Sequence, residues 1–88
     1  MRLDKFLQSS RIVKRRPVAN KICNFGKVMV NNQLAKASKN VNVGDIITID
    51  FGDRQNRIVK IYEVLEIPMG NVPKSKANAL YQISDLSP

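Results

Sequence analysis

The residues best suited to chemistry in this sequence are lysines and arginines near its start. Residues 1–40 hold ten of them and a single acid, Asp4, whereas residues 41–88 hold five cations and six acids. A surface that serves only solubility mixes the two signs, so this asymmetry indicates a binding surface for a polyanion. Four of the six cations in the first 16 residues are arginines, whose planar guanidinium suits bidentate phosphate contacts. The pattern favours nucleic acid, and above all structured RNA, as the partner.

The same composition speaks against catalysis and against metal binding. The chain has no histidine and one cysteine, Cys23. A catalytic thiol needs a neighbouring base and a zinc site needs several nitrogen or sulfur ligands, so we expect no enzyme activity, no metal and no cofactor. Cys23 is expected to be a small buried apolar residue. We expect Asp4 to cap a helix or to orient an arginine through an ion pair rather than to act as a general base.

The length and the hydropathy pattern limit the architecture. With 88 residues the chain has room for one domain and no separate catalytic module, so we expect a single domain over 1–88. It contains no apolar run long enough for a signal peptide or a membrane span. We therefore expect a cytoplasmic protein with no membrane partner.

Two short helices are predicted in the first 26 residues, one on each side of a basic run. Leu3, Phe6 and Leu7 fall at i, i+3 and i+4, which predicts a helix that ends at the serines 9–10. A second helix is predicted over 17–25, with a proline at its first position and Gly26 after its end. Its apolar stripe is expected at residues 18, 22 and 25, flanked on the same face by residues 19 and 23. Lys14, Arg15 and Arg16 would lie at the start of this second helix, where the helix dipole also favours phosphate.

From residue 27 onward the pattern changes to alternation, which predicts a small sheet. Apolar residues alternate at 28–30, 46–51, 57–67 and 79–83, with turn signals at 31–32 and 43–45 and a polar hairpin loop at 52–56. Glu63 interrupts the alternation, so we expect either a bulge near it or an edge position for it. We read 68–78 as a mobile loop and 84–88 as a frayed tail.

The aromatic residues bear on the kind of RNA that is recognised. Proteins that read unpaired bases present aromatic side chains for stacking. Here Phe6, Phe25 and Phe51 fall on apolar stripes and are expected to fill the core. This favours recognition of folded or helical RNA by its shape.

The first half of the chain closely resembles the S-four-type RNA-binding domain, a family first described in a small-subunit ribosomal protein. The resemblance covers residues 1–51 and implies an α+β fold, in which two short N-terminal helices pack on a small, curved, antiparallel-rich β-sheet. Residues 52–88 would then form a β-rich C-terminal tail. The matching residues are Arg2-Leu3-Asp4-Lys5-Phe6-Leu7, Ser10-Arg11, Lys14-Arg15-Arg16, Ala19, Gly26-Lys27-Val28, Val30-Asn31, Lys36-Ala37-Ser38 and Val43-Gly44-Asp45.

A free-standing domain of this kind looks like the RqcP group of bacterial ribosome-quality-control factors, which is related to the fifteen-kilodalton heat-shock protein. The resemblance implies binding to ribosomal RNA and P-site peptidyl-tRNA on the split large ribosomal subunit, together with the tailing factor RqcH, which adds C-terminal alanines. It also implies that Asp4 orients its neighbours, and a monomer is the simplest expectation for the free protein. The RNA-binding residues that it implies are Arg2, Lys5, Arg11, Lys14, Arg15, Arg16, Lys36 and Lys39.

Two other functions fit the same residues. A free-standing domain of this family could act in ribosome assembly or in ribosomal RNA modification. Alternatively, a strongly basic chain could coat nucleic acid without specificity, because phosphate contacts carry no sequence information. The first alternative predicts association with immature subunits, and the second predicts equal affinity for DNA and RNA.

Overall fold

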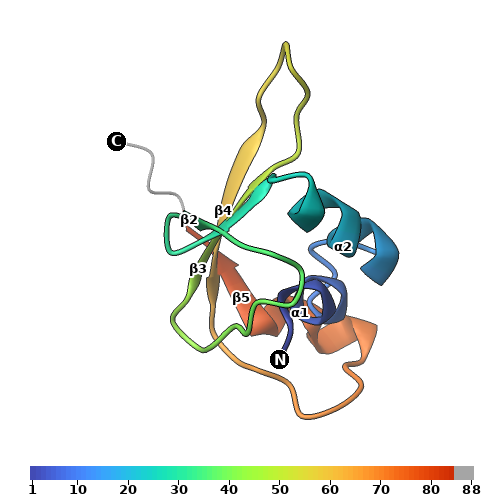
Figure 1. The fold of residues 1–88 in the computed structure, drawn as a ribbon. Coiled ribbons are helices and arrows are strands. Elements are labelled where there is room, and N and C mark those ends of the chain that lie inside the picture. The colour runs from blue at the N-terminus through green and yellow to red at the C-terminus, as the bar shows by residue number, and fades with distance from the viewer. Residues whose placement is uncertain (85–88) are drawn as a thin grey trace.

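The computed structural model describes residues 1–84, so the expected frayed tail lies almost wholly outside the described residues. Two helices precede a five-stranded antiparallel sheet with the strand order β2-β1-β3-β4-β5, and both helices lie on one side of the sheet (Figure 1). The predicted α+β fold is confirmed. The elements are α1 Leu3–Ser9, α2 Arg16–Asn24, β1 Val28–Val30, β2 Gln33–Leu34, β3 Ile46–Asp50, β4 Val59–Val64, the 3-10 helix η1 Lys74–Leu80 and β5 Tyr81–Ile83.

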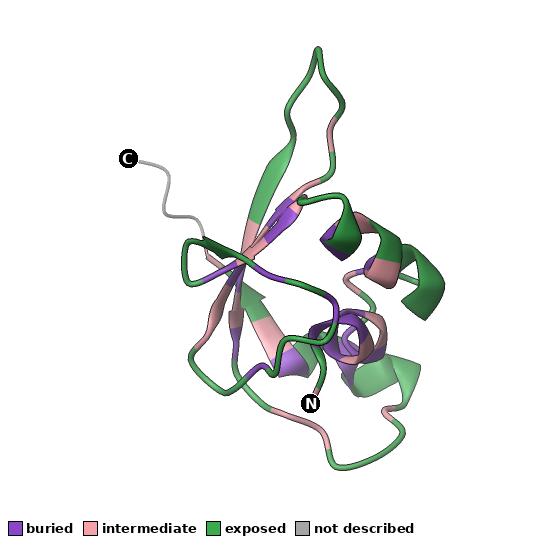
Figure 2. Ribbon diagram, viewed as in Figure 1, coloured by how far each residue is buried: buried purple, intermediate pink, exposed green. Residues whose placement is uncertain are grey.

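Helix α1 is the centre of the core. Leu3, Phe6 and Leu7 are fully buried, as their i, i+3, i+4 spacing predicts, and they pack in one cluster with the inward side chains of the sheet, such as Ile47 and Ile49. Figure 2 shows buried residues along α1 and on the strands of the sheet, whereas much of α2 is exposed. The helix ends at Ser9 as predicted. A helix of seven residues is too short to be stable alone, so it depends on this burial.

Helix α2 buries only part of its predicted apolar face, the side that carries Ala19 and Cys23. Val18 and Phe25, two members of the predicted stripe, are 46% and 70% exposed, whereas Ala19 and Cys23 are buried. Ala19 and Cys23 belong to the core cluster, and Ile22 packs partly against it. The expectation that Phe25 fills the core is therefore wrong. Gly26 does follow the helix with a φ of +74°, as its predicted C-terminal position requires.

The only thiol in the sequence belongs to Cys23, which is buried as predicted. Burial, and to a smaller extent the negative charge of Asp4, raise the pKa of this thiol to about 11. The thiol is thus protonated and unreactive at neutral pH.

The sheet follows the sequence prediction at its turns and departs from it in β4. Asn31 and Asn32 both have positive φ and form a two-residue hairpin turn between β1 and β2. The pairing of β4 with β3 and β5 is continuous and contains no bulge, and β4 is an inner strand. Both expectations for Glu63 are therefore wrong. Tyr62 and Val64 are the buried residues of β4, so Glu63 simply points to the opposite face of the sheet.

The connection between β3 and β4 extends from the body of the sheet. The hairpin between β3 and β4 projects well beyond the helices (Figure 1), and most of its residues are exposed. Phe51, expected in the core, lies at the base of this hairpin and is 44% exposed. Beyond β3 the chain leaves the surface that the helices cover, so an apolar residue there has no layer to pack against.

The segment between β4 and β5 is more ordered than predicted, and we call residues 66–80 the return loop. Its two ends meet, because the carbonyl oxygen of Leu80 accepts hydrogen bonds from the backbone N–H groups of Leu65 (2.8 Å) and Glu66 (3.3 Å). Val72 packs against the core, and Ala77 and Leu80 of η1 are buried. The expected mobile loop over 68–78 is thus an anchored loop that ends in a 3-10 helix.

Across residues 1–84, no helix has the length and apolar character that crossing a bilayer requires.

Replacing Leu7 by alanine should lower the free energy of unfolding by about 2–5 kcal/mol, because it leaves a cavity in a fully buried site. Leu34→Ala is the matched control, since this leucine is 71% exposed and its loss should change stability by no more than about 0.5 kcal/mol. Denaturant unfolding of both variants measures the difference. Equal midpoints for the two variants would contradict the central position of α1.

Candidate nucleic-acid interface

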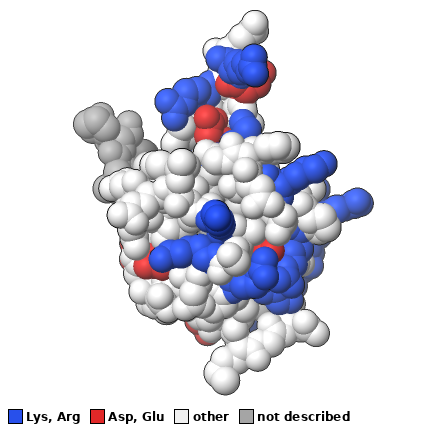
Figure 3. Space-filling view, viewed as in Figure 1, with Lys and Arg blue, Asp and Glu red and all other residues white. Residues whose placement is uncertain are grey.

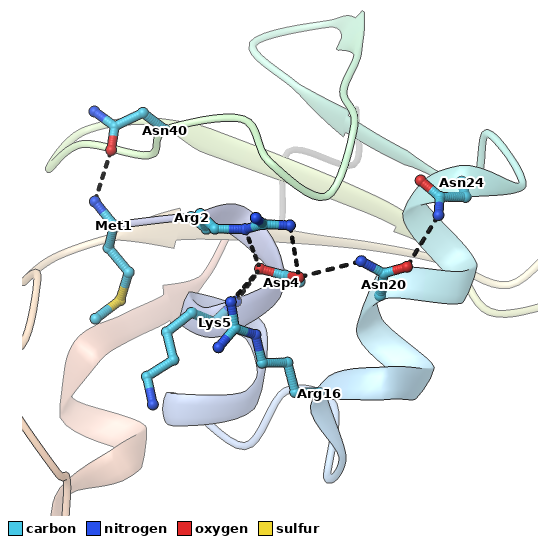
Figure 4. Close-up of polar contacts among 8 residues, drawn as sticks. All are labelled: Met1, Arg2, Asp4, Lys5, Arg16, Asn20, Asn24 and Asn40. Carbon is cyan, nitrogen blue, oxygen red and sulfur yellow. Dashed lines mark hydrogen bonds and ion pairs between the residues drawn. The ribbon is translucent and has the colours of Figure 1, made fainter.

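A buried carboxylate ties the two helices together. Asp4 of α1 is only 2% exposed, and one of its oxygens accepts hydrogen bonds from Arg2 Nε (3.2 Å) and Arg16 Nη2 (3.4 Å). Its other oxygen accepts from Arg2 Nη2 (3.3 Å) and Asn20 Nδ2 (3.3 Å). Figure 4 shows these donors converging on Asp4 from the N-terminal segment and from α2. The ion pair that the sequence suggested for Asp4 is therefore present, and it involves two arginines.

These contacts determine the charge state of Asp4. Burial by itself would raise the pKa of the carboxyl group, but the hydrogen bonds from Asn20, Arg2 and Arg16 and the charge of Arg16 outweigh it. The net result is a pKa below the usual range, so Asp4 is ionised at neutral pH. The side chains of Arg2 and Arg16 remain about half exposed. Each arginine is thus held in place by Asp4 while its remaining N–H donors face solvent.

The N-terminal end of α1 brings a second basic segment to the same place. The backbone N–H groups of Leu3 and Asp4 donate to the carbonyl oxygens of Lys39 (2.7 Å) and Ala37 (3.2 Å). In this way the segment 36–40 satisfies helix donors that have no partner inside the helix. The exposed lysines Lys36 and Lys39 consequently lie beside the start of α1 and Arg2.

Along α2 a shallow groove continues this surface. It is lined by Asp4, Arg16, Pro17, Asn20 and Lys21. Sequence reasoning missed Asn20 and Lys21 as part of the site. Asn20 could have been found from its i, i+4 spacing to Arg16, which places both residues on one face of a helix. Lys21 carries no comparable signal apart from its charge.

The remaining predicted cations belong to α1, to the connection between the two helices and to the segment 36–40. Arg15 is the N-cap residue of α2 and Arg16 its first residue, so the basic run lies at the helix start as expected. Figure 3 shows Lys and Arg side chains gathered over the region of the two helices, whereas the tip of the β3–β4 hairpin carries both signs. In the part of the chain that the structure describes, no ion pair involves the predicted cations Lys5, Arg11, Lys14, Arg15, Lys36 and Lys39.

The backbone at Arg11 has an unusual conformation. Its φ is +60°, in the left-handed region, and it follows the C-terminal end of α1, a position that glycine usually occupies. For a residue with a side chain this conformation costs roughly 1–2 kcal/mol. Arg11 therefore lowers the stability of the folded protein, and it places a cation at the end of α1.

The sequence of this chain matches a known family of protein domains. The model of the S4 domain matches residues 1–47 of this chain, more than half of it. The matched part contains both helices, β1, β2 and the segment that holds Lys36 and Lys39. The chain belongs to the S4-domain family, as the resemblance to the S-four-type domain predicted.

Within this family, the chain is similar to a smaller group of proteins. An "RQC P-site tRNA stabilizing factor" of Helicobacter pylori is 45% identical over 75 residues, which cover 84% of each chain. The protein of the same name from Halalkalibacterium halodurans is 41% identical over 88 residues, covering 100% of this chain and 94% of the relative. The trimeric structure of Vibrio cholerae heat shock protein 15 superposes with a TM-score of 0.81 at 34% identity, covering 97% and 82% of the two chains. The predicted likeness to the RqcP group and to the fifteen-kilodalton heat-shock protein is confirmed.

Asp4→Asn should lower the free energy of unfolding at pH 7 by about 1–3 kcal/mol, the range for a hydrogen bond to a charged group. Because the pKa of Asp4 is lowered on folding, its contribution is complete above the unfolded pKa of about 3.9 and is lost as the pH falls through the folded pKa. The stabilities of wild type and variant should therefore converge as the pH falls below the unfolded pKa of Asp4. Denaturant unfolding across this range measures the gap, and a gap independent of pH would contradict the role of the charge.

Arg11→Gly should raise the free energy of unfolding by up to about 1 kcal/mol. The substitution removes the cost of the left-handed conformation, and the greater entropy of glycine in the unfolded chain offsets part of the gain. Arg11→Ala is the control, because alanine lacks the charge but keeps the backbone strain. Thermal and denaturant unfolding compare the two variants. The idea fails if glycine is no more stable than alanine.

Proposed function

We propose that this chain is a non-catalytic RNA-binding factor of bacterial ribosome-associated quality control. In this proposal it binds ribosomal RNA and P-site peptidyl-tRNA on the split, obstructed large subunit. It would thereby support the addition of C-terminal alanines to stalled chains with RqcH, which places its work in the cytoplasm. The names of its relatives support the link to the pathway and to P-site tRNA.

The observation that carries the RNA-binding part is the pair of arginines held by Asp4. Arg2 and Arg16 come from different elements, share one buried carboxylate, and each remains about half exposed. A guanidinium fixed in this way loses little conformational entropy when it binds a phosphate, so it is preorganised for the contact. The lysines of the 36–40 segment and of the α2 groove extend the surface on either side. We assign phosphate contacts to Arg2, Lys5, Arg11, Lys14, Arg15, Arg16, Lys36 and Lys39.

The geometry also favours recognition by shape. The groove and the cations around it offer charged and amide donors, and they present no aromatic ring for stacking. Phosphates of folded RNA can be contacted by such a surface without unstacking any base. Phe25 is exposed at the other end of α2, beyond the groove.

Affinity capture of the tagged protein from bacterial lysate, followed by sequencing of the bound RNA and identification of the bound proteins, tests the pathway. The proposal predicts recovery of mature large subunits with tRNA and a nascent chain, depleted of small subunits. Recovery of precursor subunits would favour the assembly alternative. Recovery of mixed RNA and DNA without ribosomes would favour a general coat for nucleic acids.

Arg16→Ala should weaken binding to large subunits that carry P-site tRNA by about tenfold and reduce the salt dependence by about one counterion. The fold should persist, because Arg2 and Asn20 still contact Asp4. Arg54→Ala is the matched control, since it removes the same charge from the projecting β3–β4 hairpin. Co-sedimentation across a salt titration measures both. Equal losses for the two variants would indicate an effect of net charge alone.

A further inference from the structure

A small polar pocket lies between α1 and the return loop, outside the groove described above. It has a volume of about 180 Å³ and is lined by Lys5, Gln8, Ser9, Arg11, Asn71 and Val72. Four of these residues belong to α1 and the turn after it, and two belong to the return loop. The return loop lies entirely beyond residue 47, where the S4-domain match ends.

The lining of this pocket has the chemistry of an anion site. It combines two cations, Lys5 and Arg11, with the side-chain amides of Gln8 and Asn71, and it includes no carboxylate. Within residues 1–84 neither cation is paired with an acid. A concave site with a charge of +2 and additional N–H donors matches a phosphate group, which offers several acceptor oxygens.

The return loop holds its side of the pocket in place. Val72 packs against the core, and η1 buries Ala77 and Leu80 a few residues later. The backbone hydrogen bonds to the carbonyl oxygen of Leu80 close the base of the loop. Asn71 is thus next to an anchored residue in a compact loop, so little ordering is needed when a ligand binds.

The strained backbone at Arg11 is consistent with a binding role on the α1 side. Glycine would adopt the same φ without the steric cost, yet the position carries an arginine whose side chain lines the pocket. Strain that persists at a residue lining a charged pocket suggests that the side chain is needed there. Because α1 has seven residues, it spans about 10 Å, so the pocket and the Asp4 cluster at its other end can face phosphates of one RNA.

We propose that this pocket receives one backbone phosphate of the bound RNA and that Asn71 is a contact residue for it. The side-chain N–H of Asn71 donates to a phosphate oxygen, while Lys5 and Arg11 neutralise the charge. The return loop is then a part of the RNA-binding surface that the S4-domain core does not supply. The inference rests on the proposed RNA-binding function, which it extends to a second site.

The test compares Asn71→Ala with Asn78→Ala, a matched control because Asn78 is an exposed asparagine of the same loop that does not line the pocket. Binding is measured by co-sedimentation with large ribosomal subunits that carry P-site tRNA. We expect Asn71→Ala to weaken binding about tenfold, the loss for a hydrogen bond to a charged group, and Asn78→Ala to leave it unchanged. Equal affinities for the two variants would overturn the proposal.

A double-mutant cycle tests whether Asn71 and Arg11 share one ligand. If both contact the same phosphate, Arg11→Gly and Asn71→Ala together should cost less affinity than the product of their separate fold-losses. Glycine is used at residue 11 because it suits the left-handed backbone and so preserves the fold. Strictly multiplicative losses would contradict a shared phosphate.

A titration without RNA separates this proposal from the proposed function. Inorganic phosphate is added to the ¹⁵N-labelled full chain at constant ionic strength, with chloride as the reference. The side-chain amide signals of Gln8 and Asn71 should shift with phosphate in the wild type and not in Arg11→Gly. If phosphate causes these shifts but the protein does not bind large subunits, the proposed ribosomal function is contradicted and the anion site is supported. If the protein binds large subunits but phosphate causes no shifts, the anion site is contradicted and the proposed function is supported.

Discussion

The ionised carboxylate of Asp4 is the constraint on which the rest of this structure depends. A buried charge is tolerated only where donors surround it, and here Arg2, Arg16 and Asn20 provide them from outside α1. The same contacts therefore link α1 to α2 and orient two half-exposed guanidinium groups. Each of these arginines contacts the buried carboxylate with some of its N–H donors, which stabilises the fold, and keeps other donors for a phosphate. Removing Asp4 would disturb both, because the two arginines would then lose the carboxylate that holds them.

Sequence reasoning succeeded where the determinants are local. The spacing of Leu3, Phe6 and Leu7 identified α1, Gly26 marked the end of α2, and the asparagine pair identified the first hairpin turn. In each case a few neighbouring residues decide the conformation, so one stretch of sequence contains the information. The cluster of cations near the start was visible for the same reason.

Sequence reasoning failed where packing partners decide the outcome. Hydropathy placed Val18 and Phe25 on one buried face of α2 together with Ala19 and Cys23, yet only the two smaller residues are buried. The bulge or edge position expected for Glu63 was likewise wrong, because β4 pairs without interruption with a strand on each side. The return loop has no regular period, so its anchoring through Val72 and its position beside α1 could not be predicted. The pocket that it forms with α1 depends on contacts between residues far apart in the sequence.

The buried thiol of Cys23 makes the helix pair observable in solution. Because Cys23 is the only thiol in the chain, is buried and has a pKa raised to about 11, an alkylating reagent can modify it only after α2 has opened enough to expose it. The labelling rate of the unmodified protein then reports how often this part of the core opens without global unfolding. The same measurement on the ribosome would reveal whether bound RNA suppresses that opening, with no need to introduce a probe.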